Sequence, residues 1–61
     1  MNYVRTKLRL ERMERGDLLD VRLDAGEGVM NVPRSAQADG HAVLAVEEQP
    51  DGRWRVRIRK G

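Results

Sequence analysis

Cysteine is absent from this chain of 61 residues, and histidine occurs only once. Thiol nucleophiles, disulfides, iron–sulfur clusters and zinc sites built from cysteine or several histidines are therefore excluded for the chain as written. No apolar run approaches the roughly 20 residues of a membrane-spanning helix, and Arg5, Lys7 and Arg9 interrupt the first apolar stretch, which does not fit a signal peptide. We expect one small cytoplasmic domain, residues 1–61, without cofactor or metal.

The net charge of +2 conceals a strong asymmetry along the chain. Residues 1–16 hold five basic and two acidic side chains, residues 17–52 hold two basic and eight acidic ones, and residues 53–61 hold five basic ones only. Basic ends around an acidic middle favour an anionic or acidic partner.

Two helices are predicted. The first covers residues 2–15 and stops at Gly16, and the second covers residues 29–39 and stops at Gly40. Pro33 lies inside the second helix and predicts a kink or a restarted helix. The expected core faces, taken from helical spacing, are Tyr3, Thr6, Leu10 and Met13 on the first helix and Val29, Val32 and Ala36 on the second.

A second apolar stripe, formed by Met1, Val4 and Leu8, lies well around the first helix from its core face. It is either exposed, packed on a missing neighbour, or a partner contact. The basic set on the same helix has two interpretations as well: a solvated face, or a docking surface for an acidic partner. The candidate partner-binding residues are Arg5, Lys7, Arg9, Arg12, Val4 and Leu8.

Three strands are predicted at residues 17–24, 41–48 and 53–60. The first and last alternate between apolar and charged residues, with Trp54, Val56 and Ile58 on one face of the last strand. The run 43–46 is apolar throughout, so its core-facing side stays open. Gln49-Pro50-Asp51-Gly52 is a strong hairpin turn.

The order helix, strand, helix, strand, strand predicts a two-layer α/β sandwich, with both helices on one face of a small mixed sheet. In this arrangement the segment from Leu18 to Val46 forms a right-handed parallel crossover, and the last two strands form an antiparallel hairpin.

Five stretches of the chain, in their order and spacing, resemble the TusA/SirA family of sulfur-carrier proteins. They are Asn2-Tyr3-Val4-Arg5-Thr6-Lys7, Met13-Glu14-Arg15-Gly16-Asp17, Leu23-Asp24, Asn31-Val32-Pro33 and Gly40-His41. The closing Val56-Arg57-Ile58-Arg59-Lys60 is similar to the family's last strand. The resemblance implies the order strand–helix–strand–helix–strand–strand and a Cys-Pro-x-Pro signature at the first helix.

Met1 would occupy the x position of that signature, and Asn2 stands where the family has its second proline. The resemblance therefore implies that the first strand and the sulfur-bearing cysteine lie before Met1. We expect a late gene start or a truncated chain, and a genuinely cysteine-free paralogue is the other explanation.

By resemblance, the parent function is persulfide relay between a cysteine desulfurase and later acceptors, and the chain as given is expected to be inactive in it. The alternative is a cysteine-free interaction or regulatory module that uses the basic helix and the arginine-rich last strand. Self-association is possible in either case.

The arginines at positions 53, 55, 57 and 59 form one row, which is either a charged sheet surface that deters aggregation or a surface for an acidic partner or nucleic acid. Nucleic acid is disfavoured because Trp54 lies on the opposite face from this row. His41 is expected to have a structural turn role. Asp24 with Glu27, and Gly26 with Gly28, are expected to form a solvated loop.

Overall fold

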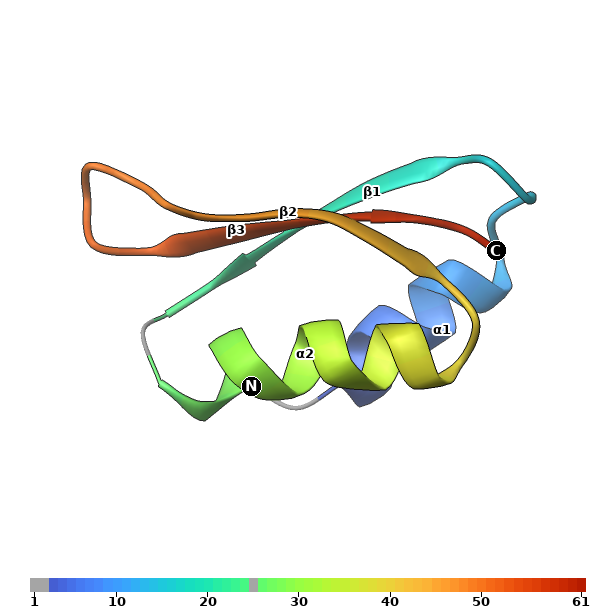
Figure 1. Cartoon of the computed structure of the whole chain (residues 1–61), viewed down its shortest axis with the longest axis horizontal. Helices are drawn as coiled ribbons and strands as arrows, with labels where there is room; N and C mark the ends of the chain where they lie inside the picture. The colour runs from blue at the N-terminus through green and yellow to red at the C-terminus, as the bar shows by residue number, and fades with distance from the viewer. Residues whose placement is uncertain (1–2, 25) are drawn as a thin grey trace.

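The computed structural model describes residues 3–24 and 26–61, apart from the side chains of residues 27 and 28. Five elements follow one another in the predicted order: α1 (Val4–Glu11), β1 (Leu18–Leu23), α2 (Glu27–Ala38), β2 (Ala42–Glu48) and β3 (Trp54–Arg59). The strands form one layer and both helices lie on the same side of it (Figure 1). The predicted two-layer α/β sandwich is therefore confirmed, while Met1, Asn2 and Ala25 lie outside the described residues.

The strand order in the sheet is β1-β3-β2, so the last strand of the chain is the central one. Both outer strands run antiparallel to β3. It follows that β1 and β2 point in the same direction, as the predicted crossover requires, but they do not pair because β3 lies between them. The prediction of a mixed sheet is corrected in this respect: among the described residues, every strand pair is antiparallel.

Helix α1 is shorter than predicted and ends at Glu11. The backbone amides of Arg12 and Met13 each bond to the carbonyl three residues earlier, at 3.1 Å, which is the tightened geometry of a helix end. Gly16 adopts the left-handed conformation (φ +92°), but it lies beyond the helix and its amide donates to the Lys60 carbonyl at 2.8 Å. Gly16 therefore leads the chain into the sheet instead of capping α1.

Helix α2 continues through Pro33 without interruption, so the predicted restart is wrong. Proline removes one backbone hydrogen-bond donor. The side chains of Val32 and Ala36, on either side of Pro33, are fully buried, and their packing holds the helix against the sheet despite the missing hydrogen bond. The end of α2 is as predicted. Gly40 has φ +90°, and the amides of Gly40 and His41 donate to the carbonyls of Gln37 and Ala36 at 3.0 Å each, which is a Schellman motif.

The core lies between the sheet and the helices, and the predicted stripes supply it. Thr6, with 3% of its surface exposed, is the buried polar residue on the core face of α1. Tyr3, Met13, Val29 and Trp54 are partly buried around the edge of the core. The buried apolar residues are Leu10, Val21, Leu23, Val32, Ala36, Val56 and Ile58.

An irregularity in β2 settles which of its residues face the core. Val43 pairs with Ile58 and Val46 pairs with Val56, so both take the core side of the sheet. Only Ala45 has a partner between them, in Arg57, which leaves Leu44 as the extra residue of a β-bulge. The bulge therefore places an exposed leucine on the outer side of the sheet.

The predicted hairpin turn between β2 and β3 is confirmed. The amide of Gly52 donates to the carbonyl of Gln49 at 3.0 Å, and Gly52 has the positive φ (+85°) that glycine adopts readily. The amide of Arg53 donates to the Asp51 carboxylate at 3.0 Å. These bonds fix the register that brings the arginines of β3 beside the acidic residues of the outer strands.

Candidate functional site

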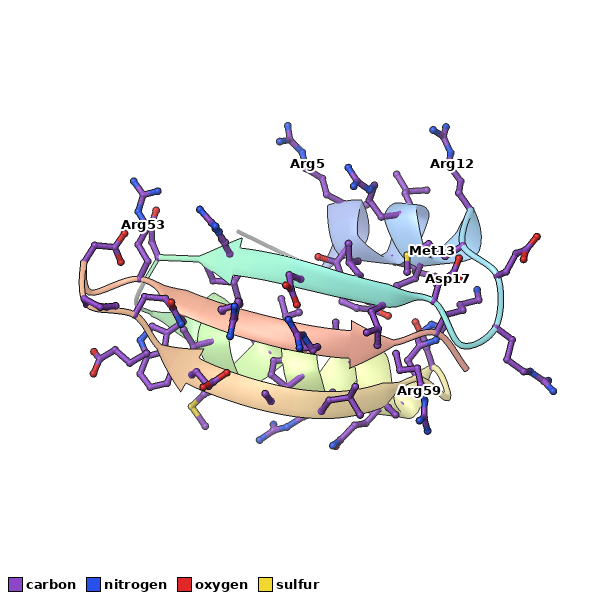
Figure 2. The ribbon with its side chains drawn as sticks, turned by 90° about the horizontal axis from the view of Figure 1, so that it is seen from above. Arg5, Arg12, Met13, Asp17, Arg53 and Arg59 are labelled. Atoms are coloured by element: carbon purple, nitrogen blue, oxygen red, sulfur yellow. The ribbon has the colours of Figure 1, made fainter. Side chains whose placement is uncertain are left out.

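Helix α1 presents a basic surface. Arg5, Leu8, Arg9 and Arg12 line one open hollow of about 300 Å³, and we call these four residues the α1 basic face. The spacing of three and four residues places Arg5, Leu8 and Arg9 on one side of the helix, and Arg12, the residue that follows α1, keeps helical backbone angles and continues that side. Figure 2 shows Arg5 and Arg12 projecting on the same side of α1, away from the sheet. Because Leu8 keeps 55% of its surface exposed, this face combines positive charge with an apolar contact.

A second hollow, of about 260 Å³, lies between α1 and the edge strand β1. Arg5, Thr6 and Arg9 line it from the helix, and the residues from Leu19 to Arg22 line it from the strand. Arg5 and Arg9 therefore stand between two depressions of the surface, where their guanidinium groups can reach a ligand in either one.

The predicted partner-binding residues do not all share this surface. Lys7 lines a different hollow, together with Glu11, Asp39 and His41. Val4 is 57% exposed, and Met1, the third residue of the predicted apolar stripe, lies outside the described residues. The structure therefore gathers Arg5, Arg9, Arg12 and Leu8 on one face and places Lys7 on another.

The two basic sets differ in their internal ion pairs. Within the described residues, none of Arg5, Arg9 and Arg12 makes an ion pair. On β3, in contrast, three of the four arginines of the row have carboxylate partners. The pairs are Arg53–Asp24 at 3.5 Å, Arg55–Glu47 at 3.1 Å and Arg57–Asp20 at 2.9 Å. The arginine row is thus largely neutralised by the sheet itself, whereas the charge of the α1 basic face remains available to a partner.

The Asp20–Arg57 pair also shifts the titration of its members. The hydrogen bonds donated by Arg57, together with its charge, lower the pKa of the Asp20 carboxyl below its ordinary value. The same carboxylate raises the pKa of the Arg57 guanidinium. Both groups therefore stay charged across the physiological range, so this pair is a fixed structural feature and does not resemble an acid–base couple.

Tyr3, at the start of α1, carries a perturbed phenol. Its hydroxyl oxygen is shielded from water and makes no hydrogen bond of ordinary geometry with the residues that the structure describes. Burial raises the pKa of the Tyr3 phenol to about 12, and the nearby Asp39 carboxylate and the negative charge of Glu11 add to this rise because they disfavour a charged phenolate. A phenol that holds its proton so firmly is a structural group and a poor general base at neutral pH.

The remaining sequence candidates have structural surroundings. The Nδ1 atom of His41 accepts a hydrogen bond from the amide of Gly61 at 3.0 Å, which ties the C-terminal residue to the end of α2. Asp24 pairs with Arg53 at the surface. The predicted loop is wrong in its extent, because α2 begins at Glu27 and includes Gly28, while the side chain of Glu27 lies outside the described residues. In the described part of the chain there is no cluster of three or more potential metal-ligating residues. Nor does any helix there have the length and apolarity to cross a membrane.

Sequence reasoning missed one surface feature. Leu18 and Leu44 are 56% and 48% exposed. Leu18 is the register partner of Arg59 on the outer side of the sheet, and the bulge residue Leu44 lies between the partners of Ile58 and Arg57. The available signal was that Leu18 stands out of phase with the alternation of Leu19, Val21 and Leu23. Leu44 gave no comparable signal, because an apolar run does not reveal where a bulge will fall.

Comparison with known proteins agrees with the family resemblance of the sequence motifs. The family model described as "Sulfurtransferase TusA" matches residues 1–60. A protein of Archaeoglobus fulgidus described as a candidate sulfur carrier is 41% identical over 58 residues, which cover 95% of this chain and 66% of the relative. A protein of Thermotoga maritima with the same description is 32% identical over 56 residues, which cover 92% of this chain and 71% of the relative. No solved structure matches the chain.

Proposed function

Since this chain belongs to the TusA family, we propose that its 61 residues form the partner-docking part of a sulfur carrier, with the α1 basic face as the docking surface. The observation that carries the proposal is the contrast in ion pairing between the two basic sets. Arg5, Arg9 and Arg12 have no carboxylate partner within the described residues, whereas three arginines of the β3 row do.

The chemistry of this surface defines its partner. Arginine enters ion pairs with carboxylates readily, and complementary charge accelerates association and fixes orientation. Leu8, between Arg5 and Arg9 on the same face, supplies the apolar contact that the centre of an interface needs. We therefore expect an acidic protein surface with an exposed apolar residue. In a sulfur relay, the candidates are the cysteine desulfurase that donates sulfur and the protein that accepts it.

Sulfur carriage itself requires a thiol. A thiolate attacks the terminal sulfur of a donor persulfide, the donor leaves as its own thiolate, and the carrier retains the transferred sulfur as a new persulfide. These 61 residues contain no cysteine, so we expect no persulfide to form on them. Intact-mass measurement after incubation with a cysteine desulfurase and free cysteine tests this: the mass should stay unchanged, and the gain of a sulfur atom would contradict the expectation.

The docking role is tested by titrating the ¹⁵N-labelled chain with a cysteine desulfurase and following the backbone amide signals. The proposal expects the largest changes at Arg5, Leu8, Arg9 and Arg12, and expects them to diminish as salt is added. Changes centred on β3, or no binding at low salt, would overturn it. Lys7 is the internal comparison, because it lies on the same helix but lines a different hollow.

The structure gives less support to nucleic-acid binding by the arginine row. Three of its four charges are already paired within the sheet. Trp54, whose ring could stack on a base, is on the core side of β3, where it packs against the buried cluster. A cysteine-free regulatory module would use the same α1 basic face, so the identity of the bound protein separates that alternative from sulfur relay.

A further inference from the structure

The outer face of the sheet is divided along its length. Figure 2 looks onto this face and shows Arg53 near the hairpin end and Arg59 at the opposite end. In register, Arg55 lies between Arg22 and Glu47, and Arg57 lies between Asp20 and Ala45, so each of these two arginines has a charged neighbour on at least one adjacent strand. Arg59, in contrast, lies between Leu18 and Ala42.

Arg59 is also the exception in its row. The other three arginines of the row have carboxylate partners, whereas Arg59 has none within the described part of the chain. Arg22 is a further outer-face arginine that makes no ion pair within the described residues, but its cross-strand neighbour is Arg55. Of the outer-face arginines that the structure describes, Arg59 is the one that combines an unpaired guanidinium with apolar neighbours on both adjacent strands.

The β-bulge enlarges this apolar surrounding. Because Val43 and Val46 both take the core side, Leu44 and Ala45 take the outer side together, next to the row that contains Ala42. Leu18 is 56% exposed and Leu44 is 48% exposed. The result is a surface in which one arginine is flanked by apolar side chains. We call it the outer-face patch, and it consists of Leu18, Ala42, Leu44, Ala45 and Arg59.

We propose that the outer-face patch binds a protein segment that presents a carboxylate between apolar side chains. The guanidinium of Arg59 can receive a carboxylate in two-point geometry, and apolar contacts with Leu18 and Leu44 would exclude water from that pair. Arginine is among the residues enriched in binding hot spots, where neighbouring contacts keep water away from it. The complementary charge of the occupant follows from Arg59 having no ion pair within the described residues, since Asp20, the acid of the adjacent register row, is paired with Arg57.

This inference goes beyond the proposed docking role of α1. The helices cover one face of the sheet and the patch lies on the other (Figure 1). A protein bound to the α1 basic face therefore leaves the outer-face patch accessible. The domain can hold two different proteins at once, one on each layer.

The test uses the complete chain labelled with ¹⁵N and two synthetic peptides: acetyl-Leu-Glu-Leu-Glu-Leu-amide and its counterpart with lysine in place of glutamate. The acidic peptide should produce saturable amide shifts at Leu18, Ala42, Leu44 and Arg59. The basic peptide should produce none. Equal responses to the two peptides, or shifts centred on α1, would overturn the proposal.

Two matched variants complete the test. Arg59→Glu should weaken binding of the acidic peptide by about tenfold or more, the effect of losing one charge-assisted contact. Arg53→Glu, in the same row but at the hairpin end, should leave the affinity within about twofold. The dispersion of the amide spectrum establishes that each variant is folded. If Arg59→Glu is folded and binds as well as the native chain, the patch is not the binding site.

Discussion

Asp20 and Arg57 form a two-point ion pair across β1 and β3. Arg57 donates from Nε to Oδ1 of Asp20 at 2.9 Å and from Nη2 to Oδ2 at 3.2 Å. The two residues are direct partners in the strand register, so the planar guanidinium meets the carboxylate without distortion of either strand. This pair shows how the sheet neutralises most of its own row of arginines, whereas Arg5, Arg9 and Arg12 make no ion pair within the described residues.

The first prediction concerns acid stability. Because Arg57 lowers the pKa of Asp20 in the folded state, the carboxylate stabilises the fold above its ordinary pKa. That contribution is lost as pH falls through the lower, folded-state value. Asp20→Asn should therefore reduce the loss of thermal stability between pH 7 and about pH 2. Melting temperatures across this range test it, with Glu48→Gln as the control, because Glu48 is exposed and makes no ion pair within the described part of the chain. An unchanged pH profile in Asp20→Asn would contradict the assignment.

The second prediction concerns Tyr3 at alkaline pH. Its folded-state pKa of about 12 exceeds the ordinary value of 10.0. Stability is therefore fully present below pH 10 and declines as pH rises through 12. Tyr3→Phe should flatten this decline. At neutral pH it should be neutral or slightly stabilising, because it removes a shielded hydroxyl that makes no hydrogen bond of ordinary geometry within the described residues. Ultraviolet titration of the native phenol gives a direct check, and a midpoint near 10 would count against the burial of the hydroxyl.

The third prediction compares two leucines of α1. Leu10 is fully buried in the core, whereas Leu8 is 55% exposed. Leu10→Ala should lower the free energy of unfolding by about 2–5 kcal/mol, which a domain this small barely tolerates. Leu8→Ala should change it by no more than about 0.5 kcal/mol. Urea denaturation measures both, and similar losses for the two variants would mean that α1 is oriented differently.

The fourth prediction concerns Pro33. Helix α2 is continuous through this residue, which cannot donate the backbone hydrogen bond of its position. Pro33→Ala restores that donor in an existing helix and should raise the free energy of unfolding by about 1–3 kcal/mol. A destabilised variant would show that the packing of the proline ring contributes more to the free energy of unfolding than the missing hydrogen bond would.

The sequence was informative where a pattern repeats over a whole element. Alternation identified the core residues of β1 and β3, and helical spacing identified Leu10, Val32 and Ala36. The turn at Pro50 and Gly52 followed from local backbone chemistry. These features depend on neighbours in the chain, and for that reason they can be predicted without the tertiary structure.

What the sequence did not reveal depends on contacts between distant segments. The central position of β3 is set by pairing with both β1 and β2, and no local pattern encodes it. The bulge at Leu44 becomes visible only once β2 is in register with β3. Two of the three ion pairs that neutralise the arginine row, Asp20–Arg57 and Asp24–Arg53, join residues far apart in the sequence. The sequence therefore showed two basic surfaces, and only the structure shows which one has internal partners.

The most direct measurement of the central claim is the affinity of a cysteine desulfurase for three forms of the chain. They are the native chain, the double variant Arg5→Gln/Arg9→Gln, and the double variant Arg53→Gln/Arg55→Gln. The second double variant also loses two positive charges, but it loses them from the arginine row. The account predicts that the α1 variant binds at least about tenfold more weakly and loses most of its salt dependence, while the β3 variant stays within about twofold of the native chain. Equal weakening in both variants, or a larger loss in the β3 variant, would contradict the account.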